Sequence, residues 1–523
     1  PIARTQGGND VTDETLPTTV LAVDVGTLFV RTALFDVVDG SYRTVATAKA
    51  LRHPGPEGER SLLVEATWAA VLQMQEVSGF TLLDRSGNVF ARRGAMTGVD
   101  LAICALSDEP RIGVVGLTAD LSTATASRAA RAVGDVVGEV TLAEPATSLS
   151  ASVTRRLLTL LETGRPDVLV LAGGTDGGAV APVVRGATIL ATLLEHVRHA
   201  PSVVFAGNQE AREAVEPTLV NVADVRVVPN VRPSRDVENP VPLQQAIERA
   251  WLERLMVANT EVRRLRDWLG ARFTLTRQAF ANGLTALAAT HGQAVLGIDA
   301  GARGITVATA RPDGICYSDR SRCGLALGNV RLEPLARTVV DQRAVHLTVE
   351  QVLDLLWNWR VRPWAVPEMA DPRLVRAIAG AVLHEAVGAA SARGVGADLH
   401  SPELIVGRGG IFESLASRPE DAAAKDLLLE VVQPGKPCRL ALDRQGTLAL
   451  AAAADAIVFG LFAEVADNDA LHWLGNGGGQ DRRDGAQDGV LAHPVSRPQS
   501  ASLLPGWLTG SVGRLFGRVA TSS

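Results

Sequence analysis

The sequence has few cysteines and histidines, and they show none of the spacings that hold a zinc ion. Its 523 residues include four cysteines: Cys104, Cys316, Cys323 and Cys438. They form no CxxC pairs of the kind found in zinc sites, so we expect four inert thiols in a reducing compartment. The nine histidines are scattered along the chain. His196 and His199 share one face of a predicted helix but have no third ligand, so we predict no metal site there.

Basic stretches, long apolar runs and common catalytic motifs are also missing. The formal net charge is −6 and no Arg/Lys stripe is present, so nucleic acid is not an expected partner. No apolar run is long enough to span a membrane, and residues 1–17 are polar, unlike a signal peptide. We therefore expect a cytoplasmic protein with a disordered N-terminal arm. GxSxG, Walker A and recognisable Ser/His/Asp or Cys/His arrangements are absent from the sequence.

A strand–turn–strand pattern is present twice in a chain whose length and 46% apolar content suit several globular domains. The apolar run 20–23 leads into the turn DVGT at 24–27 and a return strand over 29–35. The segment AVLGIDAGARGITVATA repeats the pattern, with DAG at 299–301. Two copies about 275 residues apart predict an internally duplicated fold.

Between the two copies, residues 111–240 alternate buried apolar strands with helices. This alternation predicts a parallel sheet covered by helices, with ligand loops at the carboxyl ends of its strands. The loop LAGGTDGG and the turn AGN lie at such ends and predict a loop that binds a ligand or a partner. The candidate residues are Gly173, Gly174, Thr175, Asp176, Gly177 and Asn208. The alternative is a tight loop that only needs positive φ, with Asn208 as a helix cap.

The two hairpins resemble the phosphate loops of actin-like ATPases. In those proteins two facing hairpins hold phosphate through backbone N–H groups, the Asp holds Mg²⁺ or its water shell, and a later glycine turn contacts adenosine. The later turn here is GRGG at 407–410. The resemblance implies ATP and Mg²⁺ as cofactors, with Asp24 as the Mg²⁺ residue acting through water. It implies the following nucleotide-binding residues: Asp24, Gly26, Thr27, Arg31, Asp299, Gly301, Arg303, Gly407, Gly409 and Gly410. The alternative is that both aspartates only cap their turns.

A closer resemblance is carried by three segments: RIGVVGLTADLSTATASRAARAVG, PDVLVLAGGTDGG and SVVFAGNQEA. They resemble the MutL-type glutamate mutase accessory protein family, within the actin-like ATPase superfamily, and the resemblance covers most of 20–465. It implies an α/β fold of duplicated actin-like ATPase (ribonuclease H-like) domains with an inserted βα parallel-sheet region. It also implies a chaperone-like partner of an adenosylcobalamin-dependent mutase such as glutamate mutase, which exchanges damaged cobalamin and holds none itself.

The sequence departs from the family where phosphate chemistry is expected. The family's first hairpin resembles DFGSTYTK, whereas Leu28 and Val30 replace two hydroxyl residues here and Arg31 is the basic residue. The second resembles DIGGATTDV. Compared position by position, the segment 299–307 has other residues where the family has its second glycine, both threonines and its second aspartate. Each lost charge-assisted hydrogen bond is worth roughly 1.5–3 kcal/mol, and Arg303 is a candidate to offset part of the loss. We expect at most a weak ATPase on a retained fold.

The C-terminal segment supports a second function class. Residues 503–523 place apolar side chains on one helical face, with Arg514 and Arg518 on the other, which suits a membrane-surface helix, a docking peptide or packing on its own domain. The alternative function is an actin-like structural scaffold that this helix tethers to a membrane or a partner. A sugar kinase is a third possibility, but the sequence shows no clear catalytic base for it.

The expected organisation has seven parts. They are a disordered arm (1–17), a first actin-like subdomain (18–110), a βα region carrying LAGGTDGG (111–240), a helical connector (241–290), a second actin-like domain (291–466), a flexible linker (467–502) and an amphipathic helix (503–523).

Overall fold

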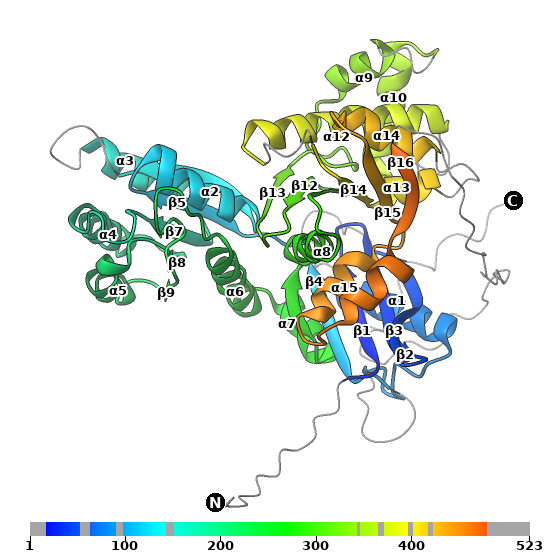
Figure 1. The fold of residues 1–523 in the computed structure, drawn as a ribbon, viewed down its shortest axis with the longest axis horizontal. Helices are drawn as coiled ribbons and strands as arrows, with labels where there is room; N and C mark the ends of the chain where they lie inside the picture. Colours follow the sequence, from blue (N-terminus) through cyan, green and yellow to red (C-terminus); the bar gives the residue numbers. More distant parts are fainter. Residues whose placement is uncertain are drawn as a thin grey trace, which may run out of the picture.

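The computed structural model contains three β-sheets, two of which face each other across a shared layer of helices (Figure 1). The described residues are 17–52, 63–89, 98–142, 151–341, 346–364, 371–395, 401–416 and 422–477. The predicted C-terminal helix and nearly all of the N-terminal arm lie outside them.

The first sheet has the strand order β10-β4-β1-β2-β3. Its strands are β1 (Val20–Val25), β2 (Phe29–Val38), β3 (Ser41–Leu51), β4 (Leu101–Leu106) and β10 (Arg272–Leu275). The first three are antiparallel, and β4 and β10 continue in parallel. Helices α1 (Leu63–Ser78) and α7 (Thr260–Leu269) share the core on one face. The predicted helical connector over 241–290 is therefore wrong in part, because β10 lies within it and completes this sheet.

The second sheet repeats this order, as β13-β12-β11-β14-β15, and adds β16 at its edge. Its strands are β11 (Val295–Ala300), β12 (Ile305–Ala310), β13 (Cys316–Ser321), β14 (Leu404–Arg408), β15 (Cys438–Asp443) and β16 (His472–Gly477). Three antiparallel strands followed by parallel ones in both sheets confirm the duplicated fold. The linker predicted from 467 begins too early, because β16 pairs with β15.

Two helices rich in small residues fill the space between the sheets: α8 (Thr276–His291) and α15 (Thr447–Asp455). They share a core with Phe35 of the first sheet and Leu404 of the second. The helices approach closely because Gly283 faces Ala452, where an added Cβ would lie 3.3 Å from the alanine Cβ. The two sheets are thus held in fixed relation, with Asp24 in β1 and Asp299 in β11 lining the same cavity.

Further helices cover the outer face of the second sheet and extend the chain beyond it. They are α9 (Leu332–Asp341), α10 (Val349–Val361), α12 (Pro372–Ala392), α13 (Gly410–Ala416) and α14 (Ala422–Val432). Helix α16 (Leu461–Val465) packs instead in the core between the two sheets, next to α15. Helix α12 is long and apolar enough to cross a membrane by length and composition alone. Its side chains pack instead in the core beneath the sheet, with Ile378 and Leu383 almost fully buried.

The third sheet is a separate unit inserted between β4 and β10 (left in Figure 1). It comprises β5 (Arg111–Gly116), β6 (Asp135–Thr141), β7 (Val168–Ala172), β8 (Ser202–Phe205) and β9 (Val225–Val227), all parallel, in the order β6-β5-β7-β8-β9. The helices on one face are α3 (Ala151–Thr159), α4 (Ala181–Leu194) and α5 (Arg212–Val220), and those on the other are α2 (Ala124–Arg131) and α6 (Val241–Ala258). The predicted parallel sheet is confirmed.

Candidate functional site

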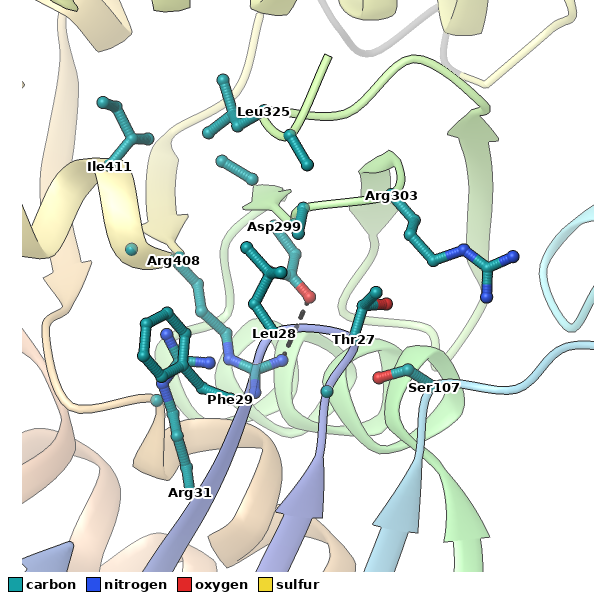
Figure 2. Close-up of a pocket in the computed structure, with 18 of the residues that line it drawn as sticks. Thr27, Leu28, Phe29, Arg31, Ser107, Asp299, Arg303, Leu325, Arg408 and Ile411 are labelled. Atoms are coloured by element: carbon teal, nitrogen blue, oxygen red, sulfur yellow. Dashed lines mark hydrogen bonds and ion pairs between the residues drawn. The ribbon is translucent and has the colours of Figure 1, made fainter. Parts of the chain in front are cut away.

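The two predicted DxG turns lie opposite each other across a cavity of about 850 Å³ between the first and second sheets (Figure 2). Each turn needs its glycine. An added Cβ would lie 2.8 Å from the Phe29 carbonyl oxygen at Gly26 and 2.7 Å from the Gly304 carbonyl oxygen at Gly301. The amide of Gly26 donates to Phe29 O at 3.0 Å and that of Gly301 to Asp299 O at 3.1 Å. Both amides are therefore used inside their own turns.

Arg408 lies at the centre of the site and joins the two turns. It is the last residue of β14 and only 3% exposed. Its Nη2 donates to Asp24 Oδ2 at 2.5 Å and its Nη1 to Asp299 Oδ2 at 3.1 Å, the contact drawn as a dashed line in Figure 2. Its Nε lies 3.5 Å from Asp443 Oδ2 at the end of β15. One guanidinium therefore contacts three carboxylates from both sheets.

Burial shifts the pKa values of Arg408 and Asp443 strongly. Burial by itself would lower the pKa of Arg408, but Asp299, Asp24 and Asp443 outweigh it and raise that pKa, so the guanidinium stays charged. Burial raises the pKa of Asp443 to about 6, against the pull of Arg408 and two backbone N–H groups. Those donors are the amides of Thr447 and Leu448 at the start of α15. The effect of burial on the pKa of Asp443 exceeds the effect of Arg408, because this ion pair is the longest of the three.

The surroundings of Asp24 do not fit the predicted Mg²⁺. Its Oδ1 accepts the hydroxyl of Thr276 at 2.8 Å, and its Oδ2 accepts from Arg408. The carboxylate is 3% exposed. A divalent cation bound directly to this carboxylate would lie beside the buried positive charge of Arg408, which disfavours it. The Mg²⁺ role of Asp24 stays a prediction.

Most residues of the predicted nucleotide site do lie together. The cavity is lined by Asp24, Gly26, Thr27, Arg31, Asp299, Gly301, Arg303, Gly409 and Gly410. Gly407 lies within β14 instead, where an added Cβ would be 3.0 Å from Leu442. Arg303 points away from Arg408 in Figure 2. The nucleotide-binding role of these residues remains a prediction.

The cavity wall is partly apolar, and it also carries ion pairs that join the two sheets. Leu28, Phe29, Leu325 and Ile411 line it. Lys49 of β3 lies 4.9 Å above the Phe29 ring and 2.8 Å from a Glu413 oxygen. Arg31 of β2 lies 3.7 Å from the other Glu413 oxygen. Because Glu413 belongs to α13, these pairs cross from the first sheet to the second.

One of the functional residues missed in the sequence, Arg408, does have a recognisable signal there. Arg408 ends an apolar strand, and a charged side chain in such a place must find buried partners. Its partners are far apart in the chain, with Asp24 separated from it by 384 positions. Asp443, Thr276 and Glu413 carried no comparable signal.

The loop predicted to bind a ligand or partner belongs to the inserted unit, outside the cavity. Asp176 Oδ1 accepts from Asn230 Nδ2 at 2.8 Å and from the Gln209 amide at 3.0 Å. Gly174 and Gly177 both have a φ of +72°. Asn208 accepts the Glu210 amide, as a helix cap does, and its Nδ2 donates to Gly178 O. The tight-loop interpretation thus accounts for these bonds. Binding of a ligand or a partner by this loop, whose residues 176–179 are exposed, stays a prediction.

The repeated sheet order and the facing DxG hairpins define a protein of the actin-like ATPase fold. Residues 20–467 match the model of the MutL protein family, and the chain belongs to that family.

Individual relatives are more distant. Protein MutL of Clostridium tetanomorphum is 30% identical over 146 residues, which are 28% of this chain and 29% of that protein. The matched stretch thus spans less than a third of the curated relative.

Among solved structures, nucleotide-free acetone carboxylase is similar with a TM-score of 0.37 and 12% identity, over 84% of this chain and 70% of that one. Component A of the Acidaminococcus fermentans (R)-2-hydroxyglutaryl-CoA dehydratase has a TM-score of 0.30 and 8% identity, over 86% and 99%. A glycerol dehydratase reactivase has a TM-score of 0.30 and 12% identity, over 79% and 99%.

Proposed function

We propose that this protein is an accessory, reactivating factor of an adenosylcobalamin-dependent mutase such as glutamate mutase. Membership in the MutL family over residues 20–467 supports this role. This match over most of the chain carries the proposal, and the expectation of weak hydrolysis rests on the residues of the cleft. The protein acts by binding its partner in the cytoplasm and a nucleotide in the cleft, with little or no turnover of ATP.

Three features of the cleft support weak hydrolysis. Leu28 places an alkyl side chain in the cavity wall where the family resemblance implies a hydroxyl. The amides of Gly26 and Gly301 are engaged within their own turns. Both oxygens of Asp24 already accept hydrogen bonds. Phosphoryl transfer relies on donors and cations aimed at the phosphates, so the loss of these groups slows it.

The role is tested by a reactivation experiment. Glutamate mutase is inactivated by loading it with hydroxocobalamin, and the full chain is then added together with adenosylcobalamin. We expect a complex in analytical ultracentrifugation and recovery of mutase activity, with serum albumin at equal concentration giving neither. Absence of both complex and recovery contradicts the proposed role.

A peripheral membrane contact through residues 503–523 remains a separate prediction, since this segment lies outside the described residues. The test is co-sedimentation of the full chain with anionic liposomes, compared with a chain ending at residue 502. Pelleting of the longer chain alone supports the contact and the scaffold alternative. Equal behaviour of the two chains excludes it.

A further inference from the structure

We infer that Arg408 is a built-in cation that takes the place of a divalent metal ion in this cleft, so that the cleft accepts an anionic ligand free of Mg²⁺. The nature of that ligand, a nucleotide, rests on the proposed function, but the role of Arg408 does not. The inference follows from geometry, charge and packing around one side chain.

The geometry leaves little room for a competing metal ion. Asp24, Asp299 and Asp443 each place one oxygen on the Arg408 guanidinium, at 2.5, 3.1 and 3.5 Å. The remaining oxygen of Asp24 accepts from Thr276. A hard divalent cation binds through several carboxylate and water oxygens, which are these same groups. To bind here, the ion would have to displace a buried guanidinium and break three ion pairs.

The charge balance of the site also disfavours a bound metal ion. Three converging carboxylates in a buried site need a counter-charge, which either a bound cation or a basic side chain can supply. Here a covalently attached guanidinium supplies it. Because this charge is always present, the carboxylates are neutralised in part before any ligand arrives.

The packing fixes Arg408 in this position. Its guanidinium carbon lies 5.9 Å from the centre of the Phe280 ring on α8. The chain turns immediately after it at Gly409, whose φ is +118° and where an added Cβ would lie 2.4 Å from the Ala300 carbonyl oxygen. The turn therefore holds β14 against β11 and aims Arg408 between the sheets. A mobile surface arginine would have neither constraint.

The direct test uses Mn²⁺ as the probe and compares the wild type with Arg408→Ser and Arg408→Lys. Free Mn²⁺ is followed by electron paramagnetic resonance. We expect the wild type and Arg408→Lys to leave Mn²⁺ free, while Arg408→Ser binds one ion at least about tenfold more tightly because three carboxylates become available. The double variant Asp299→Asn, Arg408→Ser should lose that gain. Binding of Mn²⁺ by the wild type that Asp299→Asn abolishes would overturn the inference, as would a folded Arg408→Ser that binds no ion.

Thermal unfolding keeps the test decisive if Arg408→Ser is unstable. We expect its midpoint to rise by several degrees on adding Mg²⁺, with no such rise for the wild type. If Arg408→Ser does not fold in either condition, the wild-type Mn²⁺ measurement decides alone.

A second titration separates this inference from the proposed function. ATP is titrated into the wild type by calorimetry, once with Mg²⁺ and once with EDTA. Equal affinity in the two conditions supports the inference, and a strict need for Mg²⁺ overturns it. Absence of ATP binding in both conditions overturns the nucleotide part of the proposed function, while the Mn²⁺ experiment still decides the role of Arg408.

Discussion

Asp443 links the site to pH because burial raises its pKa from the usual 3.8 to about 6. Between about pH 4 and 6 the folded protein therefore keeps a proton on Asp443 that the unfolded chain has already released. A raised folded pKa contributes stability that is complete below the unfolded pKa and is lost as pH rises through the folded one. The wild type should lose about 3 kcal/mol of unfolding free energy relative to Asp443→Asn over this range, in urea titrations at several pH values. A difference that does not change with pH contradicts this prediction.

Thr276 is expected to hold Asp24 in place for Arg408. Its hydroxyl donates to Asp24 at 2.8 Å in a buried setting. Thr276→Val removes a donor to a buried carboxylate and should lower the free energy of unfolding by about 2 kcal/mol. Thr276→Ser keeps the hydroxyl and serves as the control in chemical denaturation. Equal losses for both variants would assign the effect to packing instead of the hydrogen bond.

At the scale of elements, the inserted loop depends on Asn230, which sequence reasoning did not identify. This 5% exposed side chain donates to Gly174 O at 3.1 Å and to Asp176 Oδ1 at 2.8 Å. Asn230→Ala leaves both acceptors without this donor and should cost about 1–3 kcal/mol. Amide hydrogen exchange over 173–178 should speed up, while exchange in β11 stays unchanged. Unaltered exchange in the loop would show that Asn230 does not order it.

The elements that the sequence predicted well carry strong local signals. The hairpins of β1 and β11 follow from apolar runs interrupted by DxG, and the parallel inserted sheet follows from strands alternating with helices. The missed strands lack such signals. Strand β10 has four residues between two helices, and β16 reads HWLGNG, with two glycines and an asparagine. Each becomes a strand only because a neighbouring strand offers its edge, which is information from the tertiary structure.

The candidate site, too, was predictable only where local sequence motifs mark its residues. Nine of the ten predicted nucleotide residues line the cavity. They belong to the two DxG hairpins and the GRGG turn, which local sequence patterns mark directly. The convergence of Asp24, Asp299 and Asp443 on Arg408 could not be predicted, because it depends on how the two sheets face each other.

At the scale of the whole molecule, Glu109 joins the inserted unit to the two-sheet body. It pairs with Arg277 of α8 at 2.6 Å and with Arg320 of β13. Arg277 also donates to the carbonyls of Arg131 and Gly134 in the inserted unit.

Removing the Glu109 carboxylate should therefore be costly. Glu109→Gln leaves Arg277, which is 5% exposed, without its ion pair and should destabilise the fold by about 3–5 kcal/mol. The double variant with Arg277→Met should recover part of this loss in thermal unfolding. A double variant that is as unstable as the sum of the single changes contradicts the coupling.

Steady-state ATP hydrolysis by the purified chain with Mg²⁺ decides whether the cleft is a weak ATPase. A cleft whose central carboxylates are paired with Arg408 should turn over well below about 1 s⁻¹, the low end of ordinary enzymes. Asp24→Asn is the control that separates the chain's own activity from a contaminant. Low turnover that Asp24→Asn leaves unchanged agrees with the account. Ordinary turnover that Asp24→Asn abolishes would contradict it.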